Sequence, residues 1–124
     1  MLSSASIMAF LATPDAAQAL TFFRDTLGLR LLADEPSALV FDANGTMLRV
    51  TRVKDMAPAP YTVLGWRVAD IGTAVRDLAG RGIRFERFVD KEQDQSGVWI
   101  SPSGAREAWF KDPDGNVLSL TQFN

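Results

Sequence analysis

The sequence contains an internal repeat that covers most of its 124 residues. In each half an aspartate precedes a helical pattern of apolar residues, and a glycine ends that pattern. Asp15 leads to Gly28, and Asp70 leads to Gly82. An apolar segment comes before each aspartate, and each half closes with a glycine turn and a further apolar segment. Because a repeat of this length encodes a supersecondary unit, the sequence predicts two copies of one small module.

The two predicted helices carry both start and stop signals. Asp15 can accept hydrogen bonds at a helix N-terminus, and Gln18, three residues on, completes a capping box. Gly28 can adopt the left-handed conformation that ends a helix. Asp70 and Gly82 repeat this arrangement in the second half. The apolar residues at helical spacing are Ala16, Leu20, Phe23 and Leu27, and then Ile71, Ala74, Val75 and Leu78.

Strands are expected before each helix and after it. The order is therefore strand, helix and three strands, twice, which predicts an α+β fold. Asn44-Gly45 and Asp114-Gly115 are typical of hairpin turns. The segments with strand character are residues 7–12, 29–32, 38–41, 46–53, 62–68, 83–85, 107–110 and 117–122.

The spacing of the repeat also predicts the module boundaries. The two halves are offset by 55 residues at the capping aspartates and by 70 at the hairpin glycines, so the second half carries an insertion around residues 90–103. Prolines punctuate residues 56–60 and indicate a linker there. We therefore expect a first module over residues 1–55 and a second over residues 61–124.

The chain contains no histidine and no cysteine. The lack of histidine excludes histidine-dependent catalytic triads and 2-His-1-carboxylate metal sites. The lack of cysteine excludes disulfides and thiolate nucleophiles, and it fits a cytoplasmic protein. A net charge of −2 provides no basic field for nucleic acid, and the N-terminal segment resembles neither a signal peptide nor a membrane span.

Two segments point to a known family. Residues 22–29 read Phe-Phe-Arg-Asp-Thr-Leu-Gly-Leu, and residues 110–118 read Phe-Lys-Asp-Pro-Asp-Gly-Asn-Val-Leu. At this spacing they resemble the vicinal oxygen chelate superfamily, which includes glyoxalase I, extradiol dioxygenases, fosfomycin-resistance enzymes and bleomycin-binding proteins. The resemblance implies a single glyoxalase-like domain over residues 1–124, in which two βαβββ modules form a rolled mixed sheet around a cavity. It also implies a homodimer.

The resemblance further implies where a metal would bind. In metal-using members, the ligands are a His or Gln about seven residues before each capping aspartate and a Glu four residues after each hairpin glycine. The matching positions here hold Met8, Val63, Arg49 and Ser119. Methionine is too soft a ligand for an oxygen-rich site, valine cannot coordinate, and arginine repels a dication. We therefore expect no catalytic metal and no other cofactor.

Strand alternation predicts which side chains face the cavity. On the first strand, Ile7 and Leu11 should pack on the helix. Trp99 lies in the insertion, where loops of the family cover the cavity. The sequence does not determine which face of their strand Glu107 and Trp109 occupy. The predicted ligand-binding residues are Met8, Phe10, Met47, Arg49, Val63, Arg67, Trp99, Glu107, Trp109 and Ser119.

Arg49 and Arg67 are the arginines of this predicted lining. A guanidinium suits an anionic or carbonyl-bearing ligand. Alternatively, each arginine extends to the rim or pairs with a carboxylate such as Glu107. The acidic residues of 112–116 are interpreted as turn chemistry, and the charged run of residues 90–95 as a solvated loop.

Three functions fit these features. The first is a metal-free protein that binds a small organic ligand, anionic or aromatic, as the bleomycin-type resistance members do. The second is a lyase, isomerase or dioxygenase-like enzyme of the same superfamily, in which Glu107 is the one base that can be placed near the cavity. The third is an accessory module with a vestigial cavity. We favour the first, because it requires only a shaped and partly apolar cavity.

Overall fold

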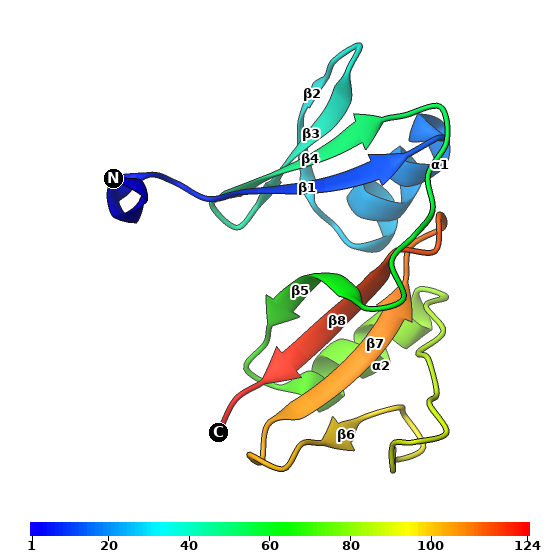
Figure 1. Ribbon diagram of the computed structural model, residues 1–124. Helices are drawn as coiled ribbons and strands as arrows, with labels where there is room; N and C mark the ends of the chain where they lie inside the picture. The colour runs from blue at the N-terminus through cyan, green and yellow to red at the C-terminus, as the bar shows by residue number, and fades with distance from the viewer. The chain divides into compact units, whose positions relative to one another are not determined.

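The computed structural model describes residues 1–124 as two compact units, Met1–Ala57 and Pro58–Asn124 (Figure 1). The boundary lies within the proline-punctuated segment 56–60. Each unit folds as a strand, a helix and three further strands, which confirms the predicted pair of βαβββ modules and the α+β class. None of the helices reaches the length and hydropathy of a transmembrane span.

Unit 1 contains a mixed four-stranded sheet in the order β1-β4-β3-β2, which does not close on itself. β1 runs parallel to β4, and the remaining neighbours are antiparallel. A short 3-10 helix, η1 (Leu2–Ser4), precedes the sheet. The other elements are β1 (Met8–Thr13), α1 (Ala16–Leu20), η2 (Thr21–Thr26), β2 (Arg30–Asp34), β3 (Ala38–Ala43) and β4 (Thr46–Arg52).

The helix of unit 1 begins at the predicted cap. The Asp15 carboxylate accepts a hydrogen bond from the Gln18 N–H at 3.1 Å. α1 continues into η2, a π-helical turn in which the Leu27 N–H donates to the Phe22 carbonyl at 2.9 Å. The rings of Phe22 and Phe23 are both buried and pack edge to face, 5.1 Å apart. A regular 3.6-residue period places only Phe23 on the apolar face, because it does not anticipate the wider π turn.

Unit 2 repeats this topology with the sheet order β5-β8-β7-β6. The strand expected over residues 83–85 is absent, so that prediction is wrong. The segment approaches β7 through a bond from the Glu86 N–H to the Trp109 carbonyl, 2.7 Å long. The outer strand is instead formed by two residues of the insertion. The elements are β5 (Thr62–Arg67), α2 (Ile71–Gly80), β6 (Trp99–Ile100), β7 (Arg106–Lys111) and β8 (Val117–Gln122).

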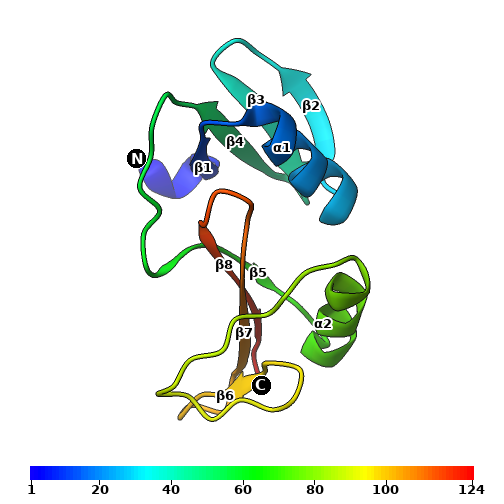
Figure 2. The same ribbon diagram turned by 90° about the vertical axis from the view of Figure 1, so that its right-hand side faces the viewer.

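Each sheet has one face covered by its own helix and one helix-free face, termed its open face (Figure 1, Figure 2). On the covered face of unit 2, Phe110 and Leu118 are fully buried, and Trp66 stacks on Phe110 with ring centroids 6.3 Å apart. On the covered face of unit 1, Leu11 is buried as expected. Ile7 is 77% exposed, so its predicted packing on the helix is wrong. It precedes β1 and therefore has no sheet neighbours to hold it.

The two hairpin turns use different chemistry. Asn44 and Gly45 have φ values of 52° and 95°, the pair of positive angles that a type I′ turn requires. The turn of unit 2 is built around the Asp112 carboxylate. It accepts hydrogen bonds from the Asp114 and Asn116 backbone N–H groups, both at 2.9 Å, and from the Asn116 side-chain amide at 2.8 Å. Burial raises the pKa of Asp112 above its ordinary value, although the hydrogen bonds from Asn116 act against this.

Candidate functional site

The open face of the unit 2 sheet gathers most of the predicted site residues of that unit. Directly opposite residues on neighbouring strands point to the same face of a sheet. Glu107 and Trp109 therefore share the open face with Ser119, which decides the orientation that the sequence left undetermined. The two rows across the strands are Gly65, Ser119 and Trp109, and then Arg67, Thr121, Glu107 and Trp99.

Three aromatic rings cluster on the β6 side of this face, and we term Phe88, Trp99 and Trp109 the aromatic box. Phe88 packs edge-on against Trp109 with centroids 5.4 Å apart, and Trp99 lies tilted beside Trp109 at 6.0 Å. The Nζ atom of Lys91 lies 4.6 Å from the ring centroid of Trp99 and 5.5 Å from that of Trp109. Both distances are within the range of about 6 Å over which a ring face attracts a cation.

The loop before β6 carries Phe88 and Lys91 to the indoles. The side chain of Gln93 holds this loop through three hydrogen bonds. The Gln93 amide oxygen accepts a bond from the Phe88 N–H at 2.8 Å, and the amide nitrogen donates to the carbonyls of Glu86 and Gly97 at 2.9 and 2.8 Å. Apart from an isolated β-bridge between Gln93 and Trp99, the loop has no strand pairing, and these three bonds help to position two of the site residues.

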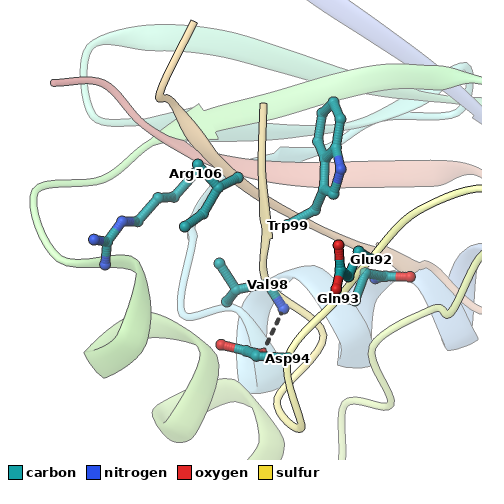
Figure 3. A pocket seen from close by; sticks show the side chains of 7 residues that line it. Glu92, Gln93, Asp94, Val98, Trp99 and Arg106 are labelled. Atoms are coloured by element: carbon teal, nitrogen blue, oxygen red, sulfur yellow. Dashed lines mark hydrogen bonds between the residues drawn. The ribbon is translucent and has the colours of Figure 1, made fainter. Parts of the chain in front are cut away.

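Asp94 fixes the same loop at its base. Its carboxylate accepts bonds from the Ser96 hydroxyl at 2.7 Å and from the Ser96 and Val98 N–H groups, both at 2.9 Å; Figure 3 shows the bond from Val98. Burial opposes ionisation of Asp94, but these bonds outweigh it, and the pKa lies below the ordinary value. The Arg87 guanidinium also donates to the Asp94 carbonyl at 2.7 Å.

A hollow of about 520 Å³ lies alongside β6 in unit 2 (Figure 3). It shares Trp99 with the predicted site. A second hollow of about 320 Å³ in the same unit contains none of the predicted residues. The residues that line the first are Glu92, Gln93, Asp94, Val98, Trp99, Ile100 and Arg106. Those that line the second are Pro58, Ala59, Pro60, Glu86, Phe88, Lys111, Gly115 and Val117.

Glu107 and Ser119 supply the polar groups beside the aromatic box. Glu107 is half-buried, and no hydrogen bond or ion pair engages its carboxylate. Ser119 is buried, and its hydroxyl lies against Gly65. A Cβ atom added to Gly65 would come within 2.9 Å of the Ser119 Oγ, so either the serine side chain must shift or the position favours glycine.

The open face of unit 1 is largely apolar. Met8, Phe10 and Met47 are 45%, 60% and 36% exposed. Arg49 lies opposite Phe10 in the sheet register, and its guanidinium donates to the Glu35 carboxylate at 3.3 Å. The predicted unit 1 residues therefore share one face, and the one cation among them is paired with a carboxylate of the same unit.

The two predicted arginines are both engaged. The guanidinium of Arg67 lies 5.2 Å from the ring centroid of Phe123, and that of Arg49 is paired with Glu35. Neither pairs with Glu107, the carboxylate that the sequence suggested. The predicted anion-binding role of the arginines stays a prediction, and ligand binding by either would compete with its present contact.

The four positions that correspond to metal ligands do not form a donor set. Arg49 is a fixed cation paired with Glu35, Val63 has no donor atom, Met8 is an exposed thioether, and Ser119 offers one hydroxyl. No group of three or more His, Cys, Asp or Glu side chains in the chain could hold a metal ion. Because divalent metals such as Mg²⁺, Mn²⁺ and Zn²⁺ need oxygen or nitrogen donors, the residues present do not fit one.

Sequence reasoning missed Lys91 and Gln93, both of which it placed in a solvated charged run. Neither residue belongs to a periodic pattern: Gln93 bonds to backbone groups within its own loop, and Lys91 contacts indoles on β6 and β7. No signal in the sequence distinguishes this lysine and this glutamine from their polar neighbours.

Comparisons with known proteins agree with this architecture. Residues 5–120 match the family model described as Glyoxalase/Bleomycin resistance protein/Dioxygenase superfamily. A solved member of that superfamily from Sphaerobacter thermophilus DSM 20745 is 25% identical with a TM-score of 0.77, covering 99% of this chain and 100% of its own. A bleomycin-binding protein complexed with bleomycin is 19% identical (TM-score 0.76, coverage 98% and 100%). Lactoylglutathione lyase from Agrobacterium tumefaciens is 20% identical (TM-score 0.69, coverage 95% and 93%). A search of curated proteins gave no significant match.

Proposed function

The chain belongs to the Glyoxalase/Bleomycin resistance protein/Dioxygenase superfamily, and on that premise we propose that it binds a small organic ligand without a catalytic metal. The observation that carries the proposal is the open face of unit 2, where Trp99 and Trp109 lie near the unpaired carboxylate of Glu107. Aromatic surface with a few polar groups is the usual composition of a small-molecule site. The bleomycin-binding protein is a case in which a chain of this fold holds an organic compound.

The metal-free part of the proposal rests on donor chemistry. Of the four corresponding positions, Met8 and Arg49 in unit 1 offer one thioether and a fixed positive charge, and Val63 and Ser119 in unit 2 offer one hydroxyl. Calorimetric titration of chelator-treated protein with Zn²⁺, Ni²⁺, Mn²⁺ and Fe²⁺ tests it. We expect no stoichiometric binding, and one-to-one binding at micromolar concentration would refute the metal-free assignment.

Ligand binding itself is tested by thermal shift of the chelator-treated protein against a panel of metabolites and antibiotics. A ligand at a hundred times its Kd adds about 2.7 kcal/mol to the free energy of unfolding, a shift that is easily measured. If no compound in the panel stabilises the protein, the vestigial-cavity alternative is favoured. For any anionic hit, Arg49→Ala and Arg67→Ala should weaken binding, and an unchanged Kd in both variants would exclude the arginine role.

A metal-independent enzyme is the second candidate, and the unpaired carboxylate of Glu107 favours it. A carboxylate with no partner in a half-buried position can act as a general base. Turnover of a bound hit is measured with and without chelator, in the wild type and in Glu107→Gln. Turnover that survives the chelator and disappears in the variant, with Kd unchanged, would identify an enzyme. A stable complex without turnover supports the binding protein.

We also propose that the protein is a cytoplasmic homodimer. The exposed apolar side chains of Met8, Phe10 and Met47 form the kind of surface that an interface covers. Light scattering over a range of concentrations should give the mass of a dimer, and Phe10→Glu should shift it toward the monomer. A monomeric mass in the wild type would refute the dimer. Cell fractionation tests the location.

A further inference from the structure

The aromatic box already holds a cation, and that cation belongs to the chain itself. The ammonium group of Lys91 lies over the faces of Trp99 and Trp109, at 4.6 and 5.5 Å from their centroids. No carboxylate lies within ion-pair distance of this ammonium group. A lysine ammonium is strongly hydrated and is normally held in water. Its position over two indoles therefore marks a place where the rings attract positive charge.

Glu107 supplies a negative charge on the same face of the sheet, outside ion-pair distance of the Lys91 ammonium group. It lies directly opposite Trp99 in the register of β6 and β7, and two residues from Trp109 on the same face of β7. Its carboxylate has no partner of its own. Ring faces and an unpaired carboxylate next to one another attract a cation through two independent terms, the ring quadrupoles and the full charge.

The occupant can leave without disturbing the box. Lys91 reaches the rings from a loop through a flexible four-carbon side chain, and its backbone is held by the turn in which its N–H donates to the Phe88 carbonyl at 3.2 Å. The rings are held by other contacts. Trp99 and Trp109 stand on paired strands, and the Gln93 side chain anchors the backbone of Phe88. Displacement of the ammonium group into water therefore leaves the three rings in place.

We infer that the aromatic box, with Glu107 beside it, is the binding site for a small organic ammonium ion, and that Lys91 occupies this site in the free protein. This assignment names the ligand class of the proposed function and rests on it. A quaternary ammonium fits best, because it has no N–H groups that hold water and therefore enters the rings at less cost than lysine. Each ligand cation that binds must first displace Lys91.

The test uses two compounds of the same shape, choline and 3,3-dimethylbutan-1-ol, which differ in the positive charge. The indole N–H signals of Trp66, Trp99 and Trp109 are followed by NMR in the full-length protein. Choline should shift the Trp99 and Trp109 signals in a saturable way. The Trp66 signal should not move, because that ring stacks on Phe110 on the covered face. The neutral alcohol should leave all three signals in place.

Two variants examine the competition directly. Lys91→Met removes the internal occupant and keeps the length of the side chain, so the Kd for choline should fall by about 2- to 30-fold, the range that a single cation–π contact spans. Glu107→Gln removes the charge and should raise the Kd. Arg81→Met is the matched control, because Arg81 follows α2 and forms an ion pair with Asp77 on that helix. It removes the same charge as Lys91→Met and should leave the Kd unchanged.

The outcomes separate this inference from the proposed function. Equal binding of choline and the neutral alcohol, or no effect of choline on the wild type and on Lys91→Met alike, would overturn the ammonium site. An equal fall in Kd in Lys91→Met and Arg81→Met would overturn it too, since net charge alone would then explain the gain. If the thermal-shift panel still yields neutral or anionic ligands in these cases, the proposed function stands. If the panel also yields nothing, both fail.

Discussion

Replacement of Asp112 by alanine should destabilise the protein far more than the same change at the equivalent turn of unit 1. Asp112 is 6% exposed, and its carboxylate accepts three hydrogen bonds of 2.8 to 2.9 Å. Bonds to a charged group contribute about 1.5–3 kcal/mol each before the cost of burying the charge is subtracted. That cost is substantial here, because burial raises the pKa of Asp112. We therefore expect a net loss of about 2–4 kcal/mol in the free energy of unfolding.

The matched control is Asp42→Ala in the turn of unit 1. Its carboxylate is 32% exposed and accepts one backbone hydrogen bond, from the Gly45 N–H at 2.8 Å. Loss of that bond should cost about 0.5–1 kcal/mol, because water replaces it. Urea denaturation followed by circular dichroism measures both variants. If the two losses agree within their error, the assignment of the Asp112 carboxylate as the organiser of its turn is wrong.

The pH dependence of this difference has a definite sign. The folded-state pKa of Asp112 lies above its unfolded-state value of about 3.8, so the folded protein binds more protons in the interval between the two. The free energy of unfolding falls as pH rises through that interval. The stability advantage of the wild type over Asp112→Ala should therefore grow as the pH is lowered from neutrality toward 3.8. A smaller advantage in acid would contradict the burial argument.

Three further predictions concern the open face and its loop. Gly65→Ala should destabilise by about 1–3 kcal/mol through overpacking against the Ser119 hydroxyl, and Gly65→Ala with Ser119→Ala should recover much of that loss in urea denaturation. Gln93→Ala removes three hydrogen bonds and should speed amide hydrogen exchange in the loop that carries it. The control Gln95→Ala replaces an exposed side chain and should leave the exchange rates unchanged. Equal exchange rates in the two variants would contradict the role of Gln93. Because the pKa of Asp94 is lowered in the folded protein, its carboxylate stabilises the fold at pH values above the ordinary aspartate pKa. This stabilisation is lost as the pH falls through the pKa of the folded state. The stability gap between wild type and Asp94→Asn should therefore narrow in acid, and a constant gap would refute this.

The sequence predicted the elements whose signals are local. Asp15 and Asp70 cap their helices, and Asn44-Gly45 forms the hairpin turn that its residues favour. These features need only neighbouring residues, because caps and turns are closed by hydrogen bonds over three or four positions. The repeat of these signals was enough to predict two βαβββ modules and the family.

The outer edge of the second sheet could not be predicted in the same way. Residues 83–85 have the composition of a strand, but the edge of β7 is occupied by β6 and by a single bond from Glu86. Two short segments compete to pair with this edge, and long-range contacts decide which one does. Local composition does not decide the pairing.

The residues of the candidate site also fall into two groups, those that the sequence predicted and those that only the tertiary structure placed. Alternation predicted that Arg49, Arg67 and Ser119 lie away from the helices, and the missing metal ligands followed from residue identity alone. The faces of Glu107 and Trp109 were decided by strand register, which pairs them with Thr121 and Ser119. The placement of Lys91 over two indoles was decided by a loop without periodicity. The sequence by itself therefore determined the modules and which residues stand at the four positions that correspond to the family's metal ligands. The tertiary structure alone brought a cation, two indoles and an unpaired carboxylate together, because contacts between residues far apart in the chain leave no pattern in the sequence.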